Sequence, residues 1–346
     1  MLNSEESEII SFAKGVAIIL VLYGHSLQYG NGTVFFSEGL YWENPVMKTI
    51  YSFHMPLFIM LSGYLSFFSI SKRGYRAAIY KRLRIFIPIC TTWAFILWFI
   101  DFLRGRTGTL LSLICYFLTD FWFLWAVIYA TIFVCLVEVT SQKFGLYGTI
   151  LCYLLFIVLA LYTPNLFWSD AYKFIIPYFM VGYYGAKNKL HIPRHFPIAI
   201  FLFLCWFILL IFYDYDAYIY TTGISLLQKD NIPYQLLVNL YRWCIGFVGC
   251  FSVLYLIVNV YKFVSKRSLP FLSILSRTIR YMGNNSIAFY LLSTYMYVYI
   301  IPPLTNDFHL NYITTAIETV LVTASCLLLW KLLSYFPALS KIVVGK

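Results

Sequence analysis

The chain has 346 residues, of which 61% are hydrophobic, 21% are aromatic and only 11% are charged. A soluble domain is about a quarter charged, so this composition excludes a soluble globular protein and indicates an integral membrane protein. The formal net charge of +11 would suggest nucleic acid as a partner of a soluble chain. In a membrane protein an excess of Lys and Arg is explained by their enrichment in cytoplasmic loops, so no nucleic-acid partner is expected.

Apolar stretches separated by Gly, Pro and charged residues predict ten membrane helices, each long enough to span or nearly span a bilayer. They cover residues 9–29, 45–70, 84–103, 121–139, 146–163, 171–187, 196–213, 234–261, 281–301 and 312–336. The stretch 109–118 is too short to span and predicts an interfacial or re-entrant piece. We expect an all-α, polytopic helical bundle that forms one membrane domain, residues 1–346, without an appended soluble domain.

The distribution of Lys and Arg predicts the topology. The even-numbered loops between the predicted helices carry fifteen Lys and Arg, whereas the odd-numbered loops carry four. Cytoplasmic loops are enriched in basic residues, so both termini are expected in the cytoplasm and the protein in the cytoplasmic (inner) membrane. The first helix is preceded by Glu5, Glu6 and Glu8 rather than by basic residues, which favours a membrane span over a cleaved signal peptide.

Lys14 and His25 place two ionisable groups in the first predicted helix, in the stretch KGVAIILVLYGH. Eleven residues at about 100° each return to within about 20° of the starting direction, so both side chains project from one face. At 1.5 Å per residue they lie about 16 Å apart along the axis. Lys14 is then expected near the cytoplasmic surface and His25 in the outer half of the membrane.

His54 and Arg242 lie at a depth similar to that of His25 on the second and eighth predicted helices. An ionisable group inside the hydrocarbon costs about 2.5 to 3.5 kcal/mol on insertion scales and usually marks a functional interior. We expect a carboxylate or an anionic ligand beside Arg242. Glu138 and Glu318 are the remaining acidic candidates inside predicted helices.

Each of these residues also has a purely structural explanation. Lys14 is close enough to the interface to extend its amine into the headgroups, and a membrane His often bonds to a neighbouring helix. Lys81, Arg82 and Arg84 form a cationic cluster before the third predicted helix. This cluster either anchors the helix to anionic lipid or receives the phosphates of an anionic cofactor.

No metal site is expected. His191 and His195 have a spacing of four residues, but Pro193 lies between them and disfavours a continuous helix. The eight Cys include no CxxC pair and mostly lie in apolar stretches, so they are expected to be buried free thiols.

Two motifs resemble the acyltransferase-3 family of membrane-bound acyltransferases. Lys14 and His25 match that family's basic residue, ten intervening positions and His, and FHMPLFIMLSGYL (53–65) closely resembles the signature of its second helix. FWFLWAVIY (121–129), YFMVGYYG (178–185) and GNNSIAFYLLS (283–293) are similar to its later, looser motifs in the same order. Many members have a His where this chain has Ser293, which leaves any role of that last His open.

The resemblance implies transfer of an acyl group, usually acetyl from cytoplasmic acetyl-CoA, to a sugar hydroxyl of a surface polysaccharide or its lipid-linked precursor. It implies that His25 is the essential imidazole, that Lys14 is its cationic partner, and that His54, Ser62 and Tyr64 line the same cavity. The partners expected are membrane lipid, acyl-CoA and the glycan acceptor.

The chemistry of the residues is compatible with this function. An imidazole is suited to remove the proton of a poor hydroxyl nucleophile, which makes His25 the expected base. Arg242 and His54 are candidates for stabilising the oxyanion. A mechanism through an acyl-enzyme intermediate on His25 or a nearby hydroxyl would use the same residues, so the sequence does not distinguish it from direct transfer.

Two functions of other classes remain open from the residues alone. In a transporter the same His, Lys and Arg would form a proton or substrate pathway, although no paired broken helices in two related halves are found. A structural or sensor protein would leave the two His at matched depth unexplained.

Overall fold

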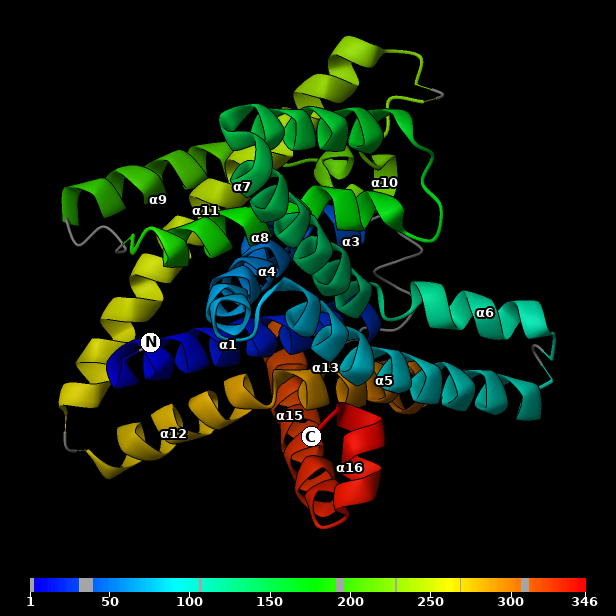
Figure 1. Ribbon diagram of the computed structural model, residues 1–346. Helices are drawn as coiled ribbons and strands as arrows, with labels where there is room; N and C mark the ends of the chain where they lie inside the picture. Colours follow the sequence, from blue (N-terminus) through cyan, green and yellow to red (C-terminus); the bar gives the residue numbers. More distant parts are fainter. Residues whose placement is uncertain are drawn as a thin grey trace. The chain divides into compact units, whose positions relative to one another are not determined.

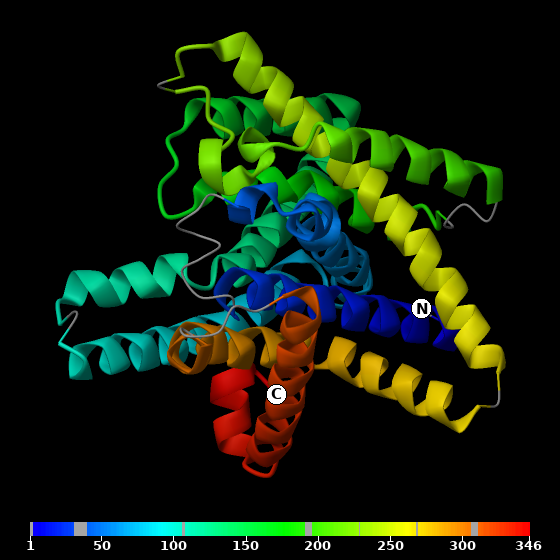
Figure 2. The same cartoon turned by 180° about the vertical axis from the view of Figure 1, so that it is seen from behind.

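The computed structural model describes residues 3–30, 40–105, 108–190, 196–227, 229–267, 269–305 and 311–346 (Figures 1 and 2). Every element in these ranges is helical, so the prediction of an all-α fold is confirmed. The elements are α1 (Ser4–His25), η1 (Ser26–Gly30), α3 (Leu40–Glu43), α4 (Pro45–Arg73), α5 (Tyr75–Leu103), α6 (Leu110–Thr119), α7 (Trp122–Tyr162), α8 (Ser169–Lys187), α9 (Phe196–Ile211), η2 (Tyr215–Ala217), α10 (Ile219–Thr222), α11 (Ile232–Lys266), α12 (Pro270–Asn284), α13 (Ser286–Tyr295), η3 (Met296–Ile300), α14 (Ile301–Thr305), α15 (Tyr312–Ser334) and α16 (Pro337–Val344).

Seven of the described helical segments are long and apolar enough to cross a membrane. They are Ser4–Tyr29, Pro45–Arg73, Tyr75–Leu103, Trp122–Tyr162, Ile232–Lys266, Ser286–Thr305 and Tyr312–Ser334. A helix also lies at each of the ten predicted places, because α7 is two helices joined at Gly145 and because α8 and α9 occupy the sixth and seventh positions. The chain is therefore a multi-pass membrane protein, while the count of ten spans and the cytoplasmic termini stay predictions.

The structure corrects two predicted helix boundaries. The third helix was expected to begin at residue 84, but α5 begins at Tyr75 and includes the cationic cluster. Lys and Arg are good helix formers, so hydropathy marks where a span begins rather than where a helix begins. The predicted helix 281–301 is divided at Asn285, where α12 ends and α13 begins.

The described residues form two compact units. Unit 1 contains Met1–Leu61, His191–Tyr215 and Cys244–Pro337, and unit 2 contains Ser62–Leu190, Asp216–Trp243 and Ala338–Lys346. Helices α4 and α11 contribute residues to both units. The prediction of a single membrane domain stays a prediction.

In unit 1, α1 packs closely along α12, and the two helices lie side by side in both views (Figures 1 and 2). A Cβ atom at Gly15 would overlap the carbonyl oxygen of Ile279, and one at Gly283 would overlap that of Ser11. Small residues allow membrane helices to pack at this distance without a hydrophobic driving force. An ion pair of 2.8 Å between Glu8 and Arg280 adds a polar contact between the same helices.

In unit 2, the Ser62-Gly63-Tyr64 motif allows α4 and α8 to approach closely. A Cβ atom at Gly63 would overlap the carbonyl oxygen of Phe179 on α8. Glu138 on α7 binds Lys187 on α8 with both carboxylate oxygens at 2.7 Å from the amine. Burying an acid inside a membrane protein is costly unless it is paired, and this pair gives Glu138 a structural role.

Candidate active site

His25 lies where the first helix changes its winding. It is the last residue of α1, and the chain continues directly into the π-helical turn η1. A second π-helical turn, η3, contacts η1 within unit 1. Ser26 of η1 and Tyr297 of η3 are buried, and their hydroxyls are 2.7 Å apart. π-Helical turns are rare and frequently occur at functional sites, so two of them in contact beside a membrane His indicate such a site.

The imidazole of His25 lies beside two tyrosine rings. The ring centroids of Tyr29 and Tyr297 are 5.9 Å and 5.8 Å from that of His25. Nδ1 is buried and has no hydrogen-bond partner among the described residues. A buried polar atom without a partner costs about 1 to 3 kcal/mol, a cost that is typical of sites where a group is held ready for chemistry.

His54 on α4 is 4% exposed and lies close enough to His25 for their charges to interact. This proximity agrees with the matched depth expected from the sequence. Nδ1 of His54 is 2.8 Å from the carbonyl oxygen of Ile50. A carbonyl only accepts a hydrogen bond, so Nδ1 carries the proton and Nε2 of the neutral ring is left as an acceptor.

Lys14 lies on α1 in the same unit, with its amine 5.9 Å from the centroid of the Phe58 ring on α4. A cation over an aromatic face gains roughly 0.5 to 2 kcal/mol. Lys14 therefore contacts the helix that carries His54, four residues further along that helix. The contact fits both a positioned cation and a structural one, so the role of Lys14 stays a prediction.

A cluster of hydroxyl groups lies beside His25 and was not predicted. Thr319 on α15 donates a hydrogen bond of 2.8 Å to the Ser26 hydroxyl, which also contacts the Tyr297 hydroxyl. The neighbouring residue, Glu318, is 8% exposed, and neither carboxylate oxygen has a hydrogen-bond partner among the described residues. Sequence reasoning singled out Glu318 as an acid inside a span but assigned it no role.

Arg242 on α11 binds a loop of unit 2, and the carboxylate or anionic ligand expected beside it stays a prediction. Its side chain is 2% exposed, and its guanidinium group donates to six acceptors. These acceptors are the carbonyl oxygens of Asp216, Ala217, Tyr218 and Gly223, the Thr222 hydroxyl and the Asn239 side chain. Carbonyl dipoles thus stabilise the buried cation, while the predicted role of Arg242 in substrate binding stays a prediction.

The remaining candidates also belong to unit 2. Arg82 turns toward α4 and donates a hydrogen bond of 2.9 Å to the hydroxyl of Ser66, whereas Lys81 and Arg84 are exposed. Ser62 accepts a hydrogen bond at its carbonyl from Ser66, and the rings of Tyr64 and Phe68 are in tilted contact with centroids 5.6 Å apart. The predicted residues therefore fall into two sets, with Lys14, His25 and His54 in unit 1 and the others in unit 2.

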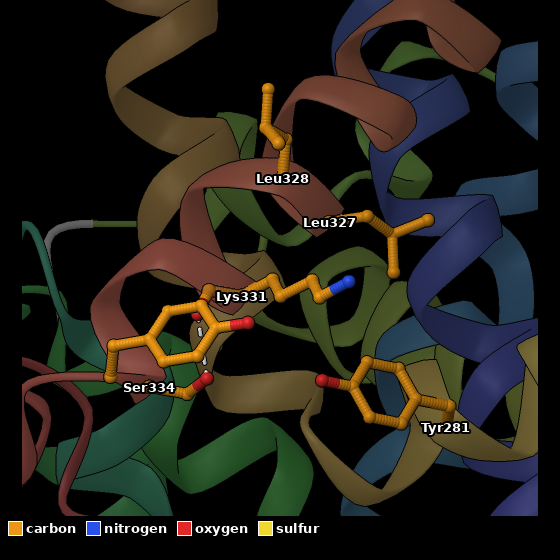
Figure 3. A pocket seen from close by; sticks show the side chains of 6 residues that line it. Tyr281, Leu327, Leu328, Lys331 and Ser334 are labelled. Atoms are coloured by element: carbon orange, nitrogen blue, oxygen red, sulfur yellow. Dashed lines mark hydrogen bonds between the residues drawn. The ribbon is translucent and has the colours of Figure 1, made fainter.

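Two surface cavities lie apart from the predicted residues. A groove of about 670 Å³ between α12 and α15 is shown in Figure 3, where the hydroxyl of Tyr281 points across it toward Ser334. Lys331, which also lines this groove, is twelve residues after Thr319 and thus about 18 Å further along α15. A cavity of about 300 Å³ in unit 2 is lined by residues of α6, α7 and α8 and of the segment before α8.

The part of the chain that the structure describes contains no group of three His, Cys, Asp or Glu side chains that could hold a metal ion. His191 and His195 lie outside the described residues. All eight Cys are free, and Cys90, Cys135, Cys152, Cys250 and Cys326 are buried as expected. The expectation was wrong for Cys115 and Cys205, which are half-buried, and for Cys244, which is exposed.

These features define a multi-pass membrane protein whose interior contains imidazole, carboxyl and hydroxyl side chains. The chain belongs to the acyltransferase-3 family, because the profile of that family, described as an acyltransferase domain, matches residues 8–335. This match confirms the resemblance found in the two helix motifs. It also favours group transfer over the transport that the same polar residues could serve.

Two curated relatives are similar to the chain. The nodulation protein NolL of Sinorhizobium fredii is 30% identical over 240 residues, which are 66% of this chain and 63% of the relative. The nodulation protein NolL of Mesorhizobium japonicum is 35% identical over 121 residues, which are 33% of this chain and 31% of the relative. The matched part therefore spans less than two thirds of either relative. No solved structure matches the chain.

Proposed function

We propose that this protein is a membrane O-acetyltransferase that moves the acetyl group of cytoplasmic acetyl-CoA to a sugar hydroxyl of a surface polysaccharide or its lipid-linked precursor. The site of action is the cytoplasmic membrane. The observation that carries the proposal is the imidazole of His25, which has a buried nitrogen without a partner and lies beside three hydroxyls where two π-helical turns meet. Family membership supports acyl transfer as the type of reaction.

His25 acts as the general base. Its imidazole removes the proton of the acceptor hydroxyl while the oxygen attacks the thioester carbonyl. This attack forms the new C–O bond and gives a tetrahedral intermediate. When the intermediate collapses, the C–S bond breaks and His25 returns the proton to the departing thiolate. An imidazole suits both steps because it gains and loses a proton near neutral pH.

His54 and Lys14 support this reaction from the same unit. The Nδ1–H group of His54 is engaged with Ile50, so its Nε2 accepts a hydrogen bond from a second hydroxyl of the sugar and thereby orients the sugar toward His25. A neutral His54 with this tautomer does not donate to an oxyanion, which would require the protonated ring. Lys14 supplies positive charge to the acyl donor on its way to His25.

The residues of unit 2 bind the substrates. Lys81 and Arg84 are exposed and contact the phosphates of acetyl-CoA, and Arg82 holds this cluster to α4 through Ser66. Ser62, Tyr64 and Arg242 contribute to acceptor binding. For Arg242 this contribution is indirect, because its guanidinium group orders the loop 216–223.

A comparison of four strains tests the proposed function. The strains carry the native gene, a deletion, the deletion complemented with native protein, and the deletion complemented with His25→Ala. Mass spectrometry of the surface polysaccharide should show the loss of acetyl groups in both the deletion and the His25→Ala strain, with the variant present in the membrane at native level. Unchanged acetylation in the deletion strain would contradict the proposed activity, and normal acetylation by His25→Ala would remove His25 from the mechanism.

A further inference from the structure

Glu318 is a buried acid that no step described above uses. It lies on α15, a membrane-spanning helix, and is 8% exposed. Neither of its carboxylate oxygens has a hydrogen-bond partner among the described residues. An ionisable group at such a position is costly and usually functional.

The other buried acid inside a span shows what a structural carboxylate looks like in this protein. Glu138 in unit 2 receives two hydrogen bonds of 2.7 Å from Lys187, which neutralises its charge. Glu318 has no such cation beside it among the hydrogen bonds and ion pairs of the described residues. Stabilisation of the fold therefore explains Glu138 and does not explain Glu318.

The position of Glu318 connects it to His25. Thr319, the next residue, donates its hydrogen bond to Ser26, which directly follows His25. The Ser26 hydroxyl also lies 2.7 Å from that of Tyr297. The ring of Tyr297 in turn lies 5.8 Å from that of His25. Glu318 and His25 thus flank the same three hydroxyls, all within unit 1.

The two groups are also chemically complementary. Nδ1 of His25 is buried without a partner, and a base that works through Nε2 needs an acceptor for its Nδ1–H group. Glu318 offers two unpaired acceptor oxygens on a helix that packs against α1 and η1. A carboxylate beside a catalytic imidazole fixes the tautomer and stabilises the imidazolium ion that forms during the reaction.

We propose that Glu318 is a positioning residue for His25, whose negative charge stabilises the protonated imidazole while the acetyl group is transferred. This inference rests on the proposed function of His25. The proton moves from the acceptor hydroxyl to His25 and then to the thiolate, and Glu318 stays ionised throughout, so it neither gains nor loses a proton. Ser26 follows His25 in the chain and accepts the hydrogen bond of Thr319, the residue after Glu318.

Two substitutions separate the charge of Glu318 from its size. Glu318→Gln keeps the size and removes the charge, whereas Glu318→Asp keeps the charge and shortens the side chain. We expect Glu318→Gln to lower acetylation per molecule of membrane protein by about 10- to 100-fold, the range known for removal of the carboxylate partner of a metal-bound His. Glu318→Asp should retain more activity than Glu318→Gln.

The assay uses the deletion strain complemented with each variant. Base-labile acetate in the surface polysaccharide is divided by the amount of protein in the membrane, so that a variant that accumulates poorly is corrected for its abundance. The matched controls are Glu138→Gln and Glu138→Asp, which alter a buried acid of equal size and should leave acetate per molecule within twofold of the native value. His25→Ala in the same assay gives the amount of acetate that is found when the protein is inactive.

The outcomes distinguish this inference from the proposed function. Lower activity in Glu318→Gln than in Glu318→Asp supports the charge role. Native activity in Glu318→Gln, or more activity there than in Glu318→Asp, with His25→Ala inactive, overturns the role of Glu318 and leaves that of His25. Native activity in His25→Ala would contradict the proposed function itself, and the inference about Glu318 with it.

Discussion

Arg242→Lys tests whether the buried guanidinium group holds a loop or acts on the substrate. Arg has five N–H donors and Lys has three, and Arg242 contacts six acceptors in unit 2. The substitution leaves at least three of these acceptors without their donor. At about 0.5 to 1.5 kcal/mol net for each hydrogen bond, the free energy of unfolding should fall by about 3 kcal/mol.

Protection of Lys229 from trypsin provides a local readout of the same change. Lys229 donates a hydrogen bond of 2.7 Å to the carbonyl oxygen of Thr222, within the loop that Arg242 binds. We expect the Arg242→Lys protein in detergent to unfold at a lower temperature and to be cleaved faster at Lys229. Arg76→Lys, an exposed substitution in the same unit, is the control and should change neither.

The reasoning would be refuted by an Arg242→Lys protein that unfolds at the native temperature and keeps Lys229 protected. If that protein had nevertheless lost acetyl transfer, the main role of Arg242 would be contact with the substrate or the oxyanion rather than support of the loop.

Two further substitutions test other parts of the account. Lys14→Ala should raise the acetyl-CoA concentration needed for half-maximal transfer, whereas Lys14→Arg should keep it close to native because the charge is preserved; equal behaviour of the two would argue against a charge role. Gly283→Val should lower the free energy of unfolding by about 1 to 3 kcal/mol, since the valine side chain would overlap the carbonyl oxygen of Ser11. The unfolding temperature should fall, and a native unfolding temperature would show that α1 and α12 can move apart without cost.

Much of the helical framework could be predicted because it follows from composition. Hydropathy located a helix at all ten expected places, and the stretch 109–118 forms the short helix α6, whose interfacial or re-entrant placement stays a prediction. Hydropathy did not show that α5 begins at Tyr75, because a basic helical turn is not apolar. The π-helical turns η1 and η3 were not predictable, since tertiary contacts rather than local propensity decide where such turns form.

The site was predicted only where a charge inside the membrane gave a signal. His25 and His54 stood out by depth, and both lie in unit 1. Ser26 and Tyr297 carried no comparable signal, because the chain has 31 Tyr and because Ser is common in membrane helices. The carbonyl partners of Arg242 were missed because they come from a loop whose fold depends on the guanidinium group itself.

The most direct test of the central claim is acetyl transfer by the purified protein. The protein, reconstituted in lipid vesicles, is incubated with acetyl-CoA labelled in its acetyl group and with surface polysaccharide extracted from the deletion strain. The account predicts that native protein transfers the label to the polysaccharide in a base-labile ester and that His25→Ala transfers none. Absence of transfer by the native protein, or equal transfer by His25→Ala, would contradict it.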